Sequence, residues 1–283
     1  MNSVSVLHEQ FDRSVGMALA RQCALADTIP DKFWTWSFTT DDDGEGLVNL
    51  PGLGLFPAQF LGSESFVSNT WLAAWANEHV HDGHAKLSCW LRGYSKDMSE
   101  ERIGGEYYSL EDMNGDYIGV IACGVSPTGA YVVLPTLDSE NNHVGDQYVL
   151  IEELPLVNYN PVPLQRIMTV CQMIMDSEQV TDSELAIKQF LGQLGFILDE
   201  TSAGEKNSVE GFTDEKGRTI ELSRREYKTV KGKDRAEFAI SCALSDSVVS
   251  PDSFDVEAQW QQFVRAPLSR CIEKIPVSVG EES

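Results

Sequence analysis

The sequence predicts an α+β protein of two domains, each a small, mainly antiparallel sheet packed with helices. Some segments repeat apolar residues at helical spacing, whereas others are short apolar runs bounded by turn residues, a pattern typical of strands. Between the two halves, Pro155, Pro161 and Pro163 fall within nine residues. Because proline fits neither a helix interior nor a central strand, we expect an extended connector there and a domain boundary near residue 158.

The first domain, residues 1–158, is expected to open with a helix and a hairpin whose turn is the polar segment 41–46. Helices are expected over 5–26, 70–77 and 87–94. Strands are expected over 33–39, 47–50, 58–61, 117–125, 130–134 and 147–151. The segment 126–129, Ser-Pro-Thr-Gly, has the composition of a turn. We therefore expect the apolar runs on either side of it to pair as a hairpin.

The second domain, residues 159–283, is expected to contain two helices, an antiparallel meander and a last helix. The first helix covers 164–175, and Thr181-Asp182-Ser183-Glu184 is a capping box that starts the second. Strands follow over 195–198, 219–227 and 236–243. The last helix carries the apolar residues Val256, Trp260, Phe263 and Val264, and Pro267 is expected to kink it.

The net charge of the 283 residues is -23, from 21 basic and 44 acidic side chains. Residues 1–158 hold 7 Lys and Arg against 23 Asp and Glu, so the excess of acid lies mainly in the first domain. A surface this anionic repels nucleic acid and anionic membranes. No apolar run approaches the roughly 20 residues that span a bilayer, and no leader pattern opens the chain, so we expect a cytoplasmic protein.

Residues 59–63 are QFLGS and residues 70–77 are TWLAAWAN. With the opening helix and the Trp34-Trp36 strand, these motifs resemble an uncharacterised bacterial domain family with the pattern Q-x-L-G-S followed by T-W-x-W-A-W-A-N. The resemblance covers residues 5–155 and departs at Ala74. It implies a bacterial cytosolic α+β domain found in settings that include toxin-immunity neighbourhoods, and it implies no activity.

Within this motif, Trp71 and Trp75 stand four residues apart. In a helix they would lie on one face, and aromatic residues at that spacing usually pack into the core. The alternative is an aromatic cage for a ligand. We expect the two tryptophans to be part of the scaffold.

Three of the five histidines, His79, His81 and His84, fall within six residues, beside Glu78 and Asp82. Imidazole and carboxylate ligands suit zinc and other divalent metals, so a metal-dependent hydrolase is one hypothesis. The spacing matches no known metal motif, and a solvated turn explains the same residues. The glycine-rich segments match neither a P-loop nor a dinucleotide-binding motif, and we expect no cofactor.

The acidic turns of the first domain are the candidate partner-binding residues. They are Asp41, Asp42, Asp43, Glu45, Glu111, Asp112 and Asp116. A strongly negative surface steers and binds basic partners, although acidic charge also keeps a protein soluble. By contrast, residues 216–235 hold eight basic against three acidic side chains. That segment would dock on the first domain, contact an acidic partner or RNA, or protect an edge hairpin with its charges.

These observations predict a non-enzymatic protein that binds a basic protein partner, without a membrane or nucleic acid. With the resemblance, they favour an immunity or antitoxin-like protein that neutralises a basic toxin or effector through its acidic surface. The alternative function is a metal-dependent hydrolase that uses His79, His81 and His84. A third hypothesis is a small-molecule sensor with its site in a cleft between the domains.

Overall fold

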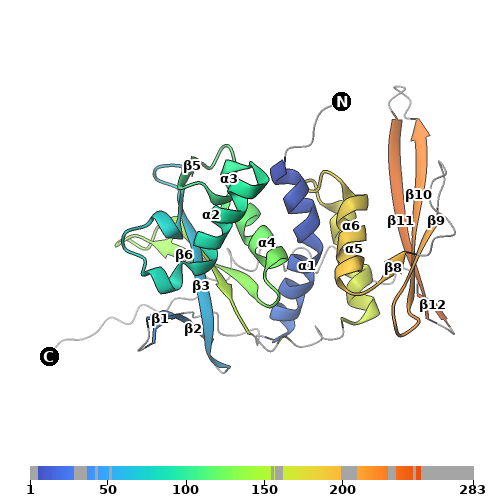
Figure 1. Cartoon of the computed structure of the whole chain (residues 1–283), viewed down its shortest axis with the longest axis horizontal. Helices are drawn as coiled ribbons and strands as arrows, with labels where there is room; N and C mark the ends of the chain where they lie inside the picture. The colour runs from blue at the N-terminus through green and yellow to red at the C-terminus, as the bar shows by residue number, and fades with distance from the viewer. Residues whose placement is uncertain are drawn as a thin grey trace.

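A computed structural model describes residues 6–28, 37–41, 44–50, 53–153, 156, 162–198, 209–228, 234–244 and 247–249. The fold is α+β, as the sequence predicts, with two sheets in which every pairing is antiparallel. Figure 1 shows the long helix α1 standing between a larger part with α2, α3 and α4 and a smaller part with α5, α6 and the second sheet.

Helix α1 spans Val6–Thr28 and confirms the expected opening helix. Its apolar stripe is buried, with Leu7, Phe11, Val15 and Ala18 all less than a tenth exposed. Helix α4 packs on one side of α1 and helices α5 and α6 pack on the other. The helix is therefore buried along most of its length.

The larger sheet has seven strands. They are β1 (Ser37–Thr40), β2 (Gly46–Leu50), β3 (Gly54–Ser65), β4 (Thr70–Ala73), β5 (Tyr107–Ser109), β6 (Ala130–Leu137) and β7 (His143–Ile151). The order is β1-β2-β3-β4-β5, with β7 on the other edge of β3 and β6 beyond β7. The predicted first hairpin is confirmed, since Phe38 pairs with Val48.

The helices of this part are α2 (Lys86–Met98), α3 (Glu101–Gly104) and α4 (Gly115–Val125), with two 3-10 turns, η1 (Ala74–Ala76) and η2 (Asp82–His84). Helix α2 confirms the helix expected around 87–94. Helix α4 overturns the strand expected over 117–125. Its residues from Ile118 to Cys123 are all buried, so their apolar run has no polar face to reveal a helical period. Strand β6 pairs with β7 and not with that segment.

The tryptophan motif also differs from the prediction. Trp71 lies in strand β4 and Trp75 in η1, so the two rings do not share a helix face. Trp71 is nevertheless a core residue, only 1% exposed, and a side chain at Gly62 would collide with its ring. The segment 70–73 is a strand and not a helix because it pairs with β3, the strand that contains QFLGS, with Gly62 opposite Ala73. Trp75 is partly exposed beneath the Arg92 guanidinium, which lies 3.9 Å from the ring centroid.

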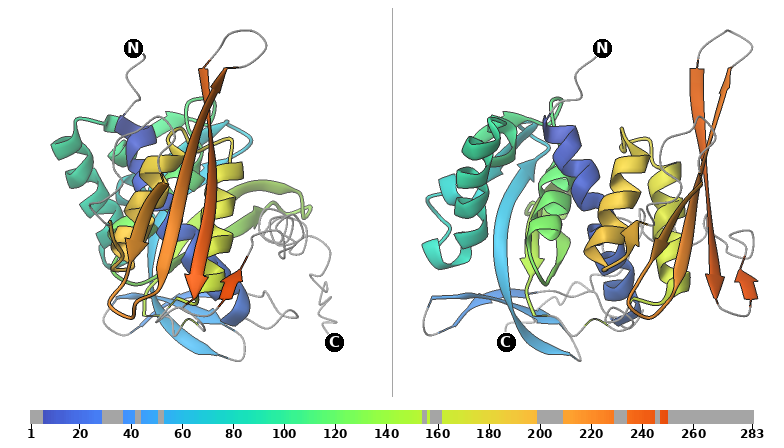
Figure 2. Two further views of the ribbon diagram at one scale, coloured as in Figure 1. Left: turned by 90° about the vertical axis from the view of Figure 1, so that its right-hand side faces the viewer. Right: turned by 45° about the vertical axis from the view of Figure 1, so that its right-hand side comes forward.

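The smaller part holds α5 (Leu164–Asp176), α6 (Ser183–Gln193), β8 (Ile197–Leu198), β9 (Val209–Thr213), β10 (Thr219–Lys228), β11 (Asp234–Leu244) and β12 (Ser247–Val249). In the order β12-β11-β10-β9-β8, strand β9 pairs only with residues 219–223 of β10, so among the described strands the basic end of β10, from Arg224 to Lys228, pairs with β11 alone. This agrees with the expectation of an edge hairpin. Figure 2 shows this sheet lying over α5 and α6. The helix expected around 256–264 lies outside the described residues.

The N-cap of α6 differs from the prediction by one residue. A capping box would put the N-cap at Thr181, but the cap is Asp182, whose carboxylate accepts the Leu185 N–H at 2.9 Å. Thr181 instead donates both its N–H and its hydroxyl to the carboxylate of Asp12 in α1. This contact fixes α6 against the first helix.

One hydrophobic core runs through both parts, joining Phe11 of α1, Leu61 of β3 and Ile121 of α4 to Phe190 of α6 and Ile240 of β11. A second, smaller core lies under the β1–β2 hairpin. The domain boundary near residue 158 stays a prediction, and the larger core continues across it. None of the helices in the described ranges combines the length and the apolar character required to span a bilayer.

Candidate functional site

Four segments meet at one end of the seven-stranded sheet, which we call the acidic end. They are the β3–β4 turn (66–69), the loop 110–114, the β6–β7 turn (138–142) and the first turn of α4. The Phe66 N–H donates to the Val144 carbonyl at 2.9 Å, and the Leu110 N–H donates to the Asn69 carbonyl at 3.1 Å. The Gly115 N–H, at the start of α4, donates to the Glu64 carboxylate of β3.

The charges of the acidic end have one sign. The sequence has no lysine or arginine between Lys32 and Lys86 or between Arg102 and Arg166, so none of the seven strands carries one. Glu111, Asp112 and Glu140 are exposed in its loops. Asp138 accepts the N–H groups of Glu140 and Asn142, and the hydrogen bonds of Asn142 hold its pKa below the ordinary value.

Exposed apolar side chains project from the same surface. Val67 is 82% exposed and Phe66 44%, both at the tip of the β3–β4 turn, which we call the apolar tip. The Phe66 ring packs edge-on against His143, with 5.0 Å between the ring centroids. Tyr107, on the neighbouring edge strand β5, is 62% exposed. Large apolar groups left in water beside a rim of acids are typical of a protein-binding surface.

Three carboxyl groups form a carboxylate cluster beneath this surface. Glu64 of β3 and Asp146 of β7 are direct cross-strand partners, and both are buried. Asp116 lies in the first turn of α4, where the Tyr131 hydroxyl is 3.4 Å from its Oδ1. His143 is within 2.7 Å of Asp146. Like charges placed opposite each other in a sheet are unfavourable, so this arrangement is unlike an ordinary scaffold.

The cluster changes how its members ionise. Burial raises the pKa of Glu64 and of Asp146, and the neighbouring carboxylates raise that of Glu64 further. Burial raises the pKa of Asp116 to about 6, while the Tyr131 hydroxyl opposes the shift and Asp146 adds to it. Desolvation therefore outweighs the hydrogen bonds. Groups with such raised pKa values concentrate at functional sites.

The predicted partner-binding acids divide among several places. Glu111 and Asp112 are exposed at the acidic end. The prediction that Asp116 lies in an exposed acidic turn is wrong, because this residue is partly buried in the carboxylate cluster. Glu45 makes an ion pair with Lys86 at 2.5 Å beside the β1–β2 hairpin, and Asp41 accepts the Glu45 N–H. Asp42 and Asp43 lie outside the described residues.

The sequence analysis missed Glu64, Asp146 and the apolar tip. A signal for Asp146 is present, because the two-residue period of a strand puts it on the face of Tyr148 and Leu150, both buried. No comparable signal predicts that Asp146 lies close to Glu64, because the sequences of β3 and β7 do not specify the register in which the two strands pair.

The histidine turn does not assemble three ligands. His84 is buried against Phe38, with 5.1 Å between ring centroids, and burial lowers its pKa. His81 lies 5.6 Å from the His84 ring, and its Nδ1 accepts the Gly83 N–H. His79 is exposed beside Glu78. Throughout the described ranges, no group of three or more His, Cys, Asp or Glu side chains is placed to hold a metal ion.

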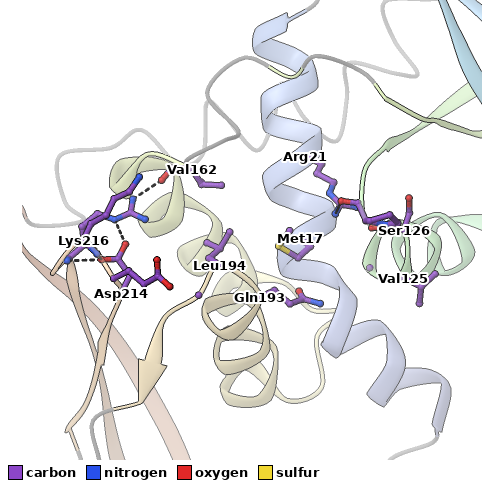
Figure 3. Close-up of a pocket in the computed structure, with 14 residues that line it drawn as sticks. Met17, Arg21, Val125, Ser126, Val162, Gln193, Leu194, Asp214 and Lys216 are labelled. Atoms are coloured by element: carbon purple, nitrogen blue, oxygen red, sulfur yellow. Dashed lines mark hydrogen bonds and ion pairs between the residues drawn. The ribbon is translucent and has the colours of Figure 1, made fainter.

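A cavity of about 690 Å³ lies between the two parts of the chain. Figure 3 shows Asp214 and Lys216, from the turn between β9 and β10, on one side and Arg21 of α1 with Ser126 on the other. Met17 and Leu194 lie between them. The cavity is therefore built by segments that are far apart in the sequence.

Comparison with known proteins yields a family but no activity. A model described as "Family of unknown function (DUF6882)" matches residues 8–154, which is more than half of the sequence. Neither a curated protein nor a solved structure matches the chain. The matched range holds all of α1 except its first two residues, the whole seven-stranded sheet and the carboxylate cluster.

Proposed function

The chain belongs to the DUF6882 family, and we propose that it is a non-enzymatic binding protein that holds a basic protein at its acidic end. The partner is a toxin or effector, so the role is that of an immunity or antitoxin-like protein. The observation that carries the proposal is a seven-stranded sheet without lysine or arginine, whose acidic end exposes Phe66 and Val67 among carboxylates.

Charge supplies the first half of the recognition. Glu111, Asp112 and Glu140 are exposed, and the described turns that carry them hold no lysine or arginine. Arg102 of α3 interacts with Asp112, but its ion pair is with Glu100. Such a surface attracts a cationic partner over several ångströms and accelerates encounter at low salt. The same field repels nucleic acid, in agreement with the expectation from net charge.

The apolar tip supplies the second half. Fully burying a valine or phenylalanine side chain contributes about 1.5 to 3 kcal/mol, so Phe66 and Val67 would retain a partner that the acids attract. Tyr107 offers a further aromatic contact, and tyrosine is enriched among residues that dominate binding energy. An apolar centre with a charged rim fits a basic surface that has an apolar residue of its own.

The test compares two variants of equal charge change. Glu111→Lys with Glu140→Lys reverses two acids of the acidic end, whereas Asp176→Lys with Glu178→Lys reverses two exposed acids at the C-terminal end of α5. Both proteins and the wild type are immobilised and exposed to lysate of the native host. The specific partner is the basic protein that the wild type and the second variant retain and the first variant loses.

Kinetics with that purified partner decide the mechanism. We expect the association rate to fall about tenfold from about 0.05 M to about 0.5 M salt, and to fall less steeply for the acidic-end variant. Val67→Ser should speed dissociation without changing stability, because the side chain is already exposed. A partner that both charge variants retain equally, or an association rate insensitive to salt, would refute the proposal.

A further inference from the structure

The cavity between the two parts is a second candidate site, and it shares no residue with the acidic end. Its volume, about 690 Å³, is within the range of pockets that hold small organic ligands. Met17, Arg21 and the segment 124–127 come from the range matched by the family model, whereas Leu194 and the β9–β10 turn lie beyond it. The site is complete only when both parts are in place.

The wall of the cavity is apolar in its middle. Met17 of α1 and Val162 before α5 are buried, and Val125 and Leu194 are partly buried against the core. Pro127 adds a rigid apolar surface. These side chains would contact the hydrocarbon or aromatic body of a ligand.

The charged groups of the cavity reverse the sign of the rest of the molecule. They are Arg21, Lys216 and Arg218 against Asp214 and Glu215. Arg218 donates to Asp214 at 2.6 Å and to the Val162 carbonyl at 2.8 Å, so this pair is internally balanced. Lys216 is exposed at the mouth and is free to turn toward a ligand.

Arg21 is held rigidly on the opposite side. Its guanidinium donates to the carbonyls of Ser126 at 2.9 Å and Pro127 at 3.1 Å, and also to that of Cys123 near the end of α4. The side chain is only 3% exposed, so its charge is fixed at the wall without reorganisation. In a chain of net charge -23, a cavity lined by three cations and two acids is a favourable place for an anion.

We propose that this cavity binds a small organic anion with an apolar body. The anionic group would lie toward Lys216, and the body would pack on Met17, Leu194 and Val125. The ligand would hold the family domain and the C-terminal segment together, because it contacts both. This proposal is independent of the binding of a basic protein, so either can fail while the other stands.

The test uses two dyes with the full-length chain. Anilinonaphthalene sulfonate is an organic anion with an apolar body, and N-phenylnaphthylamine has the same rings without the sulfonate. We expect the sulfonate dye to bind with one-to-one stoichiometry and at least about tenfold more tightly than the uncharged dye. It should also raise the urea midpoint of unfolding, since a ligand of the native state stabilises it.

Three variants locate the site. Lys216→Glu should weaken the sulfonate dye about tenfold and leave the uncharged dye unchanged. Gln193→Trp, at an exposed wall position, should obstruct the cavity and weaken both dyes. Lys96→Glu, with the same charge change on an exposed residue of α2, should change neither. No binding by the wild type, equal binding of the two dyes, or equal effects of the two lysine variants would overturn the proposal.

Discussion

Ionisation of Asp116 in the carboxylate cluster destabilises the native state, and this effect can be measured. Burial raises its pKa to about 6 from an ordinary value of 3.8, so the native state binds this proton more tightly than the unfolded chain does. Stability from this group is therefore greatest below about pH 4 and is lost as the pH rises through 6. The carboxylate is ionised at pH 7 and destabilises the native state there.

We expect Asp116→Asn to raise the free energy of unfolding at pH 7 by about 2 kcal/mol, because asparagine cannot ionise. The gain should narrow steadily toward pH 4, where aspartate is also neutral in the native state. Urea unfolding of both proteins between those pH values measures it. Asp112→Asn, an exposed neighbour, is the matched control and should change little. A gain independent of pH would contradict the assigned ionisation.

Asp12 is a second buried acid whose pKa burial raises, but its hydrogen bonds join two helices. It is fully buried in α1 and accepts the Thr181 hydroxyl at 2.6 Å and the N–H groups of Thr181 and Asp182 at 3.1 and 2.9 Å. Removing the acceptor breaks all three hydrogen bonds, and because Thr181 and Asp182 are exposed, their donors can turn to water, so Asp12→Ala should cost about 1 to 2 kcal/mol. Denaturant unfolding measures the loss.

The control for Asp12 is Glu9→Ala in the same helix. Glu9 pairs with Arg13 in water, both side chains being 42% exposed, and such surface pairs contribute well under about 1 kcal/mol. If both variants lost the same stability, the contact between α1 and α6 would not depend on Asp12.

At the scale of elements, amphipathic segments were predictable and fully buried ones were not. Helices α2, α5 and α6 each present one apolar face, and a helical period reveals it. Helix α1 is buried on more than one side, but polar residues such as Gln10 and Arg21 interrupt its apolar residues and leave a helical spacing to read. Helix α4 is covered by α1 on one side and the sheet on the other, so its apolar run is as compatible with a strand as with a helix.

The candidate site divides in the same way. Exposed acids in polar loops, such as Glu111 and Asp112, were predictable from composition. The carboxylate cluster depends on the register that sets Glu64 opposite Asp146, and on a helix start that brings Asp116 to them. These three carboxyl groups come together only when distant strands pair, and neither local spacing nor residue type predicts that pairing.

Two glycines offer a test of how α1 is packed. A methyl group at Gly16 would collide with the Phe190 ring of α6, whereas no described atom lies within 4 Å of one added at Gly93 of α2. Gly16→Ala should cost about 1 to 3 kcal/mol through overpacking. Gly93→Ala should stabilise by about 0.5 to 1 kcal/mol, because alanine is the better helix former. Thermal or urea unfolding gives both signs, and two stabilising outcomes would mean that α1 and α6 are not in contact at Gly16.

At the scale of the whole molecule, charge and core have different distributions. The sheet of the family domain has no lysine or arginine, while β10 carries Arg224, which lies 3.2 Å from Glu184 of α6. Beyond Ser223, the basic end of β10 pairs only with β11 among the described strands, so it lies at an edge of the C-terminal sheet. The hydrophobic core crosses between the two parts, which are joined through α1.

A shared core predicts that the two parts unfold together, and the tryptophans make this testable. Five of the six tryptophans precede residue 158, so tryptophan fluorescence reports mainly on the family domain. Ile240 lies in β11 of the other part and is 3% exposed, so Ile240→Ala should cost about 2 to 5 kcal/mol. If the core is cooperative, that loss lowers the urea midpoint seen by tryptophan fluorescence and by circular dichroism equally.

The control for Ile240→Ala is Glu215→Ala, in an exposed turn of the same part, which should leave both midpoints in place. A fluorescence midpoint unmoved by Ile240→Ala would mean that the family domain folds independently, and that the boundary near residue 158 separates two units of stability.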